Sequence, residues 1–322
     1  MSDEEMSEES MEKMDLKVKI GKTVFKNPIW VASGTFGNGE EFQEFVNLDN
    51  VGAVITKTVT LYEREGNPSP RLVETPSGLL NSIGLENKGI RKFKKEKLPY
   101  LKRLKTRTIA SVAGEIEEEF VRCTQELTGM ECPDAIELNL SCPNVAHKGG
   151  ENRLFAQDPA VTERIVSAVR RKTTSTLIVK LTPNVTDISE TAKAARAGGA
   201  DAVSLVNTYL GMAVDAEAMK PCLGNVTGGV SGPAIKPMAL KAVWDVYNNV
   251  DIPVIGIGGI MTGRDAAEFM LCGASAVQVG TVNLVEPTAH ERILKEFVAY
   301  LRRKKIKRAG ALVGKLKTRR KS

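Results

Sequence analysis

Polar and reactive side chains recur where short apolar runs of this sequence end. Lys57 and Lys180 each lie at the end of such a run, and Asn139 and Asn207 lie at the ends of two others. A lysine inside an apolar strand is costly unless its ammonium meets an anion or reaches water. Two lysines at strand ends favour a site for an anionic group, and the asparagines can donate and accept hydrogen bonds together.

Cys142 lies just beyond the apolar run 135–140, in the stretch NLSCPN. A lone cysteine is more often a small buried hydrophobe than a catalyst. This one enters a loop stiffened by Pro143 and could lie near lysines that favour its thiolate. The pattern leaves both a structural thiol and a catalytic thiol open.

Two glycine-rich run ends occur late in the chain, GIGGI over residues 256–260 and Gly280 followed by Thr281. Glycine lets backbone N–H groups approach an anion closely, and loops after the last two strands of a barrel form a common phosphate site. Tight turns or helix caps would explain any one pair alone. Because the two glycine-rich stretches follow the last two runs, we predict a phosphate site and a phosphorylated cofactor.

Eight apolar runs supply the strands that must position these residues. They cover Ile29–Ser33, Ala53–Thr58, Thr108–Val112, Ala135–Leu140, Leu177–Leu181, Ala202–Asn207, Val254–Ile257 and Ala276–Gly280. Most are continuous rather than alternating, as expected of parallel strands covered on both faces. Helix-like segments lie between them at Glu115–Leu127, Pro159–Arg171, Ile188–Ala197, Lys236–Tyr247 and Gly263–Leu271. This order predicts an α/β fold, a single (β/α)8 TIM barrel.

Two intervals, Leu61–Arg107 and Tyr209–Asp251, are longer than one helix needs. We predict that they are insertions at the C-terminal mouth of the barrel, where ligands bind. The alternative is an open doubly wound sheet, which needs a glycine-rich fingerprint after its first strand. Residues 33–39 read SGTFGNG, which lacks the GxGxxG spacing, so the barrel is favoured.

The net charge of +6 is distributed unevenly over the 322 residues. Residues 1–15 hold seven acidic residues and one lysine, whereas residues 301–322 hold eleven basic residues and no acid. We predict an acidic disordered arm over 1–15, a cofactor-binding barrel over 16–300 and a basic tail over 301–322. In this tail, Leu301, Ile306, Leu312, Val313 and Leu316 favour an apolar stripe on a helix over a nucleic-acid contact.

The five cysteines have neither CxxC spacing nor the density of a disulfide framework. No run of about 18 apolar residues occurs, and the acidic start does not resemble a signal peptide. We therefore expect a cytoplasmic protein without a membrane contact, and a nucleic-acid partner is not favoured.

A series of stretches resembles the class 1 dihydroorotate dehydrogenases, in the order that this family shows. They are NPIWVASGTFG, ITKTVT followed by EREGNPSPR, LLNSIGLEN, ELNLSCPN, VKLTPN, VNTYLGMAVD, GGVSGPAIKP, IGIGGI and QVGT, between residues 16 and 299. NLSCPN with NSIGLEN is the specific part, whereas the glycine stretches alone would fit many FMN barrels. NTYLGMAVD and GGVSGPAIKP resemble the NAD-linked 1B subclass more than the fumarate-using 1A homodimers.

The resemblance implies oxidation of (S)-dihydroorotate to orotate in de novo pyrimidine (UMP) biosynthesis, with FMN across the barrel mouth. The FMN contacts that it implies are Ala32, Ser33, Lys57, Thr58, Asn139, Lys180, Val206, Gly232, Gly258, Gly259, Gly280 and Thr281. The implied substrate contacts are Lys57, Asn81, Ile83, Gly84, Leu85, Asn139, Asn144, Asn207 and Thr208. Cys142 would remove a proton beside a carbonyl while hydride passes to the flavin, and Lys180 would stabilise the reduced flavin.

The 1B resemblance also implies electron transfer to a second subunit that carries FAD and a 2Fe-2S cluster, and then to NAD. We expect a homodimer, or a heterotetramer with such a subunit, and no metal site in this chain, since no cysteine cluster here could hold iron and sulfur.

Two other FMN barrels are alternatives: dihydropyrimidine dehydrogenase, which shares the CPN and GGVSG stretches, and tRNA dihydrouridine synthase, which pairs a loop cysteine with flavin. The NSIGLEN stretch disfavours tRNA dihydrouridine synthase. A non-enzymatic scaffold is disfavoured because it needs no lysine or asparagine at its strand ends.

Overall fold

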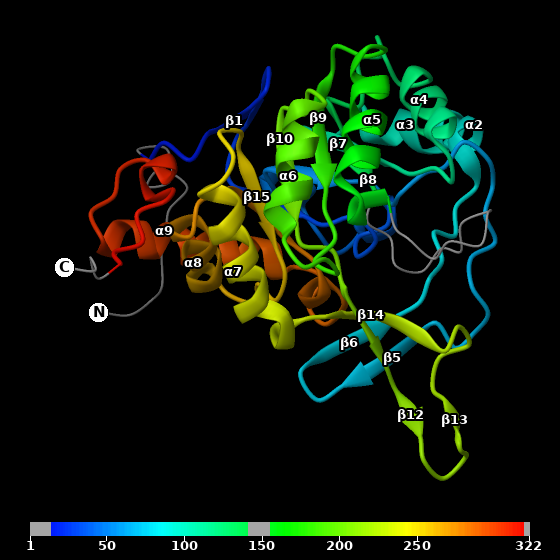
Figure 1. Ribbon diagram of the computed structural model, residues 1–322. Coiled ribbons are helices and arrows are strands. Elements are labelled where there is room, and N and C mark those ends of the chain that lie inside the picture. Colours follow the sequence, from blue (N-terminus) through cyan, green and yellow to red (C-terminus); the bar gives the residue numbers. More distant parts are fainter. Residues whose placement is uncertain (1–13, 141–154, 319–322) are drawn as a thin grey trace.

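A closed barrel of eight parallel strands forms the centre of the computed structural model, which describes residues 14–140 and 155–318 (Figure 1). In ring order the strands are β3 (Ile29–Val31), β4 (Ala53–Ile55), β7 (Arg107–Val112), β8 (Ala135–Asn139), β9 (Thr176–Lys180), β10 (Ala202–Leu205), β15 (Val254–Ile257) and β16 (Ala274–Val279). β16 pairs with β3 and closes the ring. Each predicted run overlaps one of these strands, and β7, β9 and β16 begin one or two residues before their predicted runs, so the predicted TIM barrel is confirmed.

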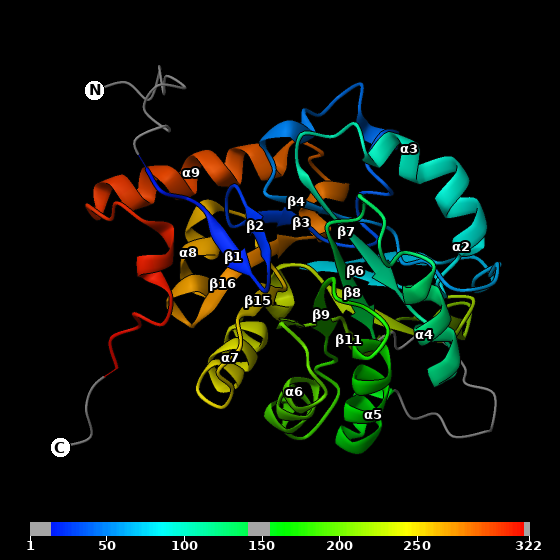
Figure 2. The same cartoon turned by 90° about the horizontal axis from the view of Figure 1, so that it is seen from above.

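Helices surround the strands on the outside, as the view along the barrel shows (Figure 2). They are α2 (Gly89–Lys92), the π-helical turn η3 (Phe93–Lys97), α3 (Leu98–Leu101), α4 (Glu117–Gln125), α5 (Pro159–Arg170), α6 (Ile188–Ala197), α7 (Lys236–Tyr247), α8 (Gly263–Leu271) and α9 (Ala289–Arg303). Side-chain caps fix where several begin: the Asp158 carboxylate accepts from the first turn of α5, and that of Asp187 from the first turn of α6.

A short hairpin of β1 (Val18–Ile20) and β2 (Thr23–Phe25) closes the amino-terminal end of the barrel. Its Val18, Ile20 and Phe25 form one buried cluster with inward-facing residues near the starts of the barrel strands, including Trp30. The rings of Phe25 and Trp30 are 4.3 Å apart between centroids. Since this end is filled with apolar side chains, a ligand can enter only at the opposite, carboxyl-terminal end.

The two predicted insertions meet in one antiparallel sheet beyond the carboxyl ends of the barrel strands (Figure 1). Its order is β11 (Tyr209–Met212), β14 (Thr227–Ser231), β6 (Gly78–Asn81) and β5 (Leu72–Thr75). β14 pairs with β6 in the register Gly229 to Asn81, which joins segments from the two halves of the chain. A two-stranded extension, β12 (Val214–Asp215) with β13 (Lys220–Pro221), projects from this sheet, which we call the mouth sheet.

The described part of the basic tail is not one helix, contrary to the prediction. α9 ends at Arg303, Lys305 adopts a φ of 57°, and a 3-10 turn, η7 (Ala309–Leu312), follows. Leu301 and Leu312 are nevertheless buried in the main core, whereas Leu316 stays exposed. The apolar residues of the tail thus pack on the barrel through a turn rather than a continuous stripe.

Within residues 14–140 and 155–318, no helix has the length and apolar character needed to cross a membrane.

Candidate active site

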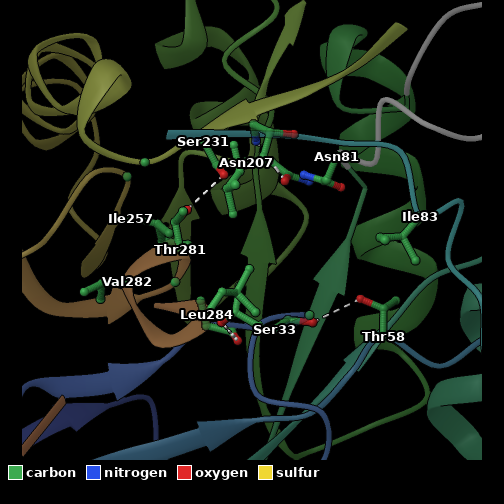
Figure 3. A pocket seen from close by; sticks show the side chains of 18 of the residues that line it. Ser33, Thr58, Asn81, Ile83, Asn207, Ser231, Ile257, Thr281, Val282 and Leu284 are labelled. Carbon is green, nitrogen blue, oxygen red and sulfur yellow. Dashed lines mark hydrogen bonds between the residues drawn. The ribbon is translucent and has the colours of Figure 1, made fainter. Parts of the chain in front are cut away.

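A pocket of about 500 Å³ lies at the carboxyl ends of the barrel strands, between the strand ends and the mouth sheet (Figure 3). Eighteen of the residues that were predicted to bind FMN or substrate line it. These are Ala32, Ser33, Lys57, Thr58, Asn81, Ile83, Gly84, Leu85, Asn139, Lys180, Val206, Asn207, Thr208, Gly232, Gly258, Gly259, Gly280 and Thr281. The other two predicted residues, Cys142 and Asn144, lie outside the described residues.

Further residues line the pocket that the sequence did not single out. They are Gly34, Thr35, Gly37, Phe42, Leu72, Leu79, Glu86, Ser231, Ile235, Ile257, Ile260, Met261, Val282 and Leu284. Several neighbour predicted residues in the chain, so proximity along a strand-end loop was a usable signal. Leu72 carries no such signal, because it reaches the pocket through the mouth sheet, in which β5 pairs with β6.

Hydroxyl groups hold the floor of the pocket in place. Ser33 Oγ donates to the Thr56 carbonyl oxygen (2.8 Å) and lies 3.2 Å from Thr58 Oγ1, a contact visible in Figure 3. Thr58 Oγ1 is also 2.8 Å from Ser111 Oγ and accepts from Asn139 Nδ2 (3.2 Å). The chain of bonds links β8 and the loops after β3 and β4, so the polar atoms of this floor are preorganised.

The roof of the pocket comes from the mouth sheet and the loop after β10. Asn81 Nδ2 donates to the Gly229 carbonyl oxygen (3.2 Å), while Asn207 Oδ1 accepts from the backbone N–H of Thr208 (2.9 Å). A Cβ on Gly229 would lie 2.0 Å from Thr208 Oγ1, so only glycine lets β14 approach so closely. Asparagine amides from two elements therefore face one cavity.

The glycine-rich loops after β15 and β16 form one end of the pocket. Within the described chain, the backbone N–H groups of Gly258, Gly259, Gly280 and Thr281 donate to no backbone acceptor. Thr281 Oγ1 donates to Ser231 Oγ (2.9 Å), and Figure 3 shows the two side chains pointing toward each other. Free N–H groups beside a pocket can bind an anion such as a phosphate.

α8 follows the first of these loops and begins with a capping box of Thr262 and Asp265. Asp265 also accepts from Lys236 Nζ (2.5 Å) and from the backbone N–H of Met261 (2.9 Å). Burial alone raises the pKa of the Asp265 carboxyl, but the hydrogen bonds from Lys236 and from the backbone outweigh it, so this pKa lies below its usual value. The ionised carboxylate fixes the loop that carries Gly258 and Gly259.

Two lysines face the pocket from the barrel side. Lys180, the last residue of β9, is only 6% exposed, and Asn139 is its register partner on β8. Among the residues that the structure describes, no carboxylate lies within 4.0 Å of the ammonium of Lys180 or Lys57, although most other buried or half-buried cations of this protein have such a partner. A nearly buried, unpaired ammonium at a pocket suits an anionic ligand.

One wall of the pocket is apolar. Phe42 lines it and stacks on Phe36, with ring centroids 4.3 Å apart. The rings of Phe36 and His290 make an edge-to-face contact, with centroids 5.8 Å apart. His290 is 1% exposed, and its desolvation lowers the pKa of the imidazole, with the charge of Glu291 only partly opposing this. The imidazole behind this wall is therefore neutral at pH 7.

No group of three or more His, Cys, Asp and Glu side chains that could hold a metal occurs in the described ranges. The pocket instead combines free backbone N–H groups, unpaired ammonium groups and amides, all of which suit an organic anion.

Comparison with known proteins places this pocket in a family. The family model described as "Dihydroorotate dehydrogenase" matches residues 15–301. The chain belongs to the dihydroorotate dehydrogenase family. The match spans all eight barrel strands and both insertions, so the family assignment covers the whole pocket.

Similar curated proteins share the name "Dihydroorotate dehydrogenase B (NAD(+)), catalytic subunit". The protein of Bacteroides fragilis is 49% identical over 302 residues, covering 94% of this chain and 99% of the relative. That of Citrifermentans bemidjiense is 49% identical over 306 residues (95% and 99%), and that of Geobacter sulfurreducens 52% identical over 291 residues (90% and 94%). The predicted family and its NAD-linked subclass are confirmed, and the two alternative flavoenzyme classes lose support.

Proposed function

We propose that this protein oxidises dihydroorotate to orotate, with FMN bound in the pocket as the electron acceptor. The observation that carries the proposal is the convergence of asparagine amides, two lysines without an ion pair among the described residues and a glycine-rich anion site on one pocket, in a chain of the dihydroorotate dehydrogenase family.

FMN fits the residues present. Its phosphate would take the N–H groups of Gly258, Gly259, Gly280 and Thr281, which have no backbone acceptor among the described residues. The ring system would lie over the floor formed by Ala32, Ser33, Thr58, Val206 and Gly232. When bound, FMN supplies a two-electron acceptor that takes hydride from the substrate. Lys180 would hold a positive charge beside the ring, where negative charge collects on reduction.

Dihydroorotate is a six-membered ring with amide N–H and carbonyl groups and a carboxylate, so it needs donors and acceptors together. Asn81, Asn139 and Asn207 offer both from one side chain each, and the roof and floor bonds described above restrict their orientation. The backbone at Gly84 and Leu85, both with positive φ, would receive the carboxylate, with Lys57 nearby. Asn144 is proposed as a further substrate contact.

Substrate oxidation requires removal of one proton and one hydride from neighbouring carbons. We assign the proton to Cys142, which lies outside the described residues and follows Leu140 by two positions in the sequence. Leu140 directly follows Asn139, a residue of the pocket wall. Because an ordinary thiol has a pKa of about 8.5, positive charge from nearby lysines would favour the thiolate that acts as the base.

The electrons would next pass to a partner protein. The relatives are named catalytic subunits of an NAD(+)-linked enzyme, which supports a second subunit that transfers electrons. We propose that this subunit carries FAD and a 2Fe-2S cluster, that NAD is the final acceptor, and that the catalytic chain forms a homodimer within a heterotetramer.

Anaerobic mixing of the yellow protein with dihydroorotate tests the proposal. We expect the flavin absorbance near the visible maximum to be bleached by dihydroorotate and not by dihydrouracil. Cys142→Ala should keep FMN but lose most of the bleaching rate, as removal of a general base costs roughly 10²–10⁴-fold. Bleaching by dihydrouracil alone, or reoxidation of the reduced flavin by tRNA, would assign the pocket to one of the alternative enzymes instead.

A further inference from the structure

The described part of the basic tail carries many cations that form no ion pair with another described residue. Seven exposed basic residues occur between residues 303 and 317, and among the described residues only Arg308 forms an ion pair, with Asp15. The cations with no such pair are Arg303, Lys304, Lys305, Lys307, Lys315 and Lys317. A second lysine-rich surface, over α2 and α3, differs in that most of its cations form ion pairs.

On that second surface, acidic side chains pair with most of the cations. Lys88 lies 2.7 Å from a carboxylate oxygen of Glu63, and Lys94 lies 2.7 Å from one of Glu126. Lys97 pairs with Glu40 at 2.7 Å. The basic tail thus lacks the acidic partners that the second surface has, and its concentrated positive charge suits an anionic occupant.

The start of the described chain is attached to the middle of this basic surface. The Asp15 N–H donates to the Lys307 carbonyl oxygen (3.1 Å), and the Ala309 N–H donates to the Asp15 carbonyl oxygen (2.8 Å). These bonds form a parallel bridge between Asp15 and Arg308. Both ribbon views show the dark blue chain start beside the red tail (Figures 1 and 2).

The acidic arm therefore starts among the unpaired cations. Its first thirteen residues hold six acidic side chains and one lysine. They can reach at most about 45 Å from their attachment point, and attachment gives them an effective concentration on the order of millimolar near the tail. Charges within about 10 Å attract each other at 0.1 M salt, so an arm of opposite sign has an advantage over any free anion.

We propose that the acidic arm binds the basic tail of its own chain and screens it from other polyanions. The interaction is a set of exposed ion pairs, so it depends on salt and involves no single geometry. It would also offset about half of the charge of a tail with eleven basic residues from within the chain, since residues 1–15 hold seven acidic residues and one lysine.

The test compares two variants of the full-length, FMN-loaded protein with the same change in net charge. In the arm variant, the six acids of residues 1–13 become amides: D3N, E4Q, E5Q, E8Q, E9Q and E12Q. In the control variant, six exposed glutamates elsewhere, which form no ion pair with another described residue, become glutamine: E44Q, E65Q, E74Q, E96Q, E163Q and E217Q. The probe is a fluorescent 15-nucleotide oligo(dT), with affinity measured at 0.1 M and 0.5 M NaCl.

We expect the arm variant to bind the oligonucleotide on the order of tenfold more tightly than the control variant at 0.1 M NaCl, because a tail that is free a tenth of the time weakens apparent affinity tenfold. In the wild type, carbodiimide coupling should join arm carboxylates to Lys304, Lys305 or Lys307 at low salt and not at 1 M NaCl. Equal affinity of the two variants, or couplings spread evenly over surface lysines, would overturn the proposal. Wild-type binding as tight as that of the arm variant would instead identify an open nucleic-acid surface.

Discussion

Replacing Lys180 by methionine tests the assignment of the flavin site most directly. The side chain is 6% exposed, and no carboxylate of the described chain lies within 4.0 Å of its ammonium. If the charge serves a bound flavin, its loss should lower the midpoint potential of FMN and leave the fold intact. If the charge instead stabilises the fold, the substitution should leave the midpoint potential of FMN unchanged and destabilise the protein.

The magnitude follows from Coulomb's law. At an effective dielectric constant of about 20, a charge pair 4–8 Å apart interacts by about 2 to 4 kcal/mol. For a two-electron couple, about 30 mV corresponds to 1.4 kcal/mol, so Lys180→Met should lower the potential by roughly 45 to 85 mV. The flavin-free protein should not lose melting temperature, because methionine removes a buried charge that has no partner among the described residues.

Equilibration with a redox dye of known potential under anaerobic conditions measures this shift. Lys193→Met is the matched control: it removes one positive charge from an exposed lysine of α6 that pairs with Glu190. The control potential should move by less than about 10 mV, since exposed charges are screened within a Debye length. An unchanged potential in Lys180→Met, or a fall in melting temperature of the flavin-free protein, would refute the role given to this lysine.

Three further changes address the loop and the wall around the pocket. Gly259→Ala should weaken FMN binding at least about tenfold in a fluorescence titration, because the residue has a φ of 71° and a Cβ would lie 2.7 Å from Lys236 Cβ; wild-type affinity would contradict the anion site. Asp265→Asn should cost about 1–3 kcal/mol in urea unfolding at pH 7. Because the folded pKa of Asp265 is lowered, the wild type holds this stability above the unfolded value and loses it as the pH falls through the folded pKa, so the difference between the two proteins should shrink in acid. The wild type should lose stability as the pH falls below about 6.5, because the folded pKa of the buried His290 imidazole is lowered and the unfolded chain binds its proton more tightly. His290→Leu should abolish this loss. Parallel pH profiles of the two proteins would show that His290 does not titrate in this range.

The barrel and its site residues were predictable because local signals agree with tertiary structure. Continuous apolar runs became buried strands, and polar residues such as Lys180 and Asn139 at their ends necessarily meet at one rim. α6, α7 and α8 match their predicted bounds, and α6 and α8 do so where Asp187 and Thr262 provide caps. The site roles themselves came from the family resemblance rather than from spacing.

The mouth sheet could not be predicted from local patterns. β14 contains Gly228 and Gly229, which disfavour a strand by themselves, and its partner β6 lies 148 residues earlier, as Gly229 pairs with Asn81. The residue at which α9 ends could not be predicted from local patterns either. Nothing in the run of basic residues around Lys305 marks the positive φ that turns the chain there.

The pairing of β6 with β14 has a consequence for protein engineering. Loops of barrel enzymes are often exchanged one at a time to change specificity, on the assumption that each folds independently. Here two insertions form a single sheet, in which Asn81 donates to the backbone of Gly229 in the other insertion. A chimera that receives one insertion from a relative would leave an unpaired strand edge above the pocket, whereas transplanting both together would preserve the enclosure.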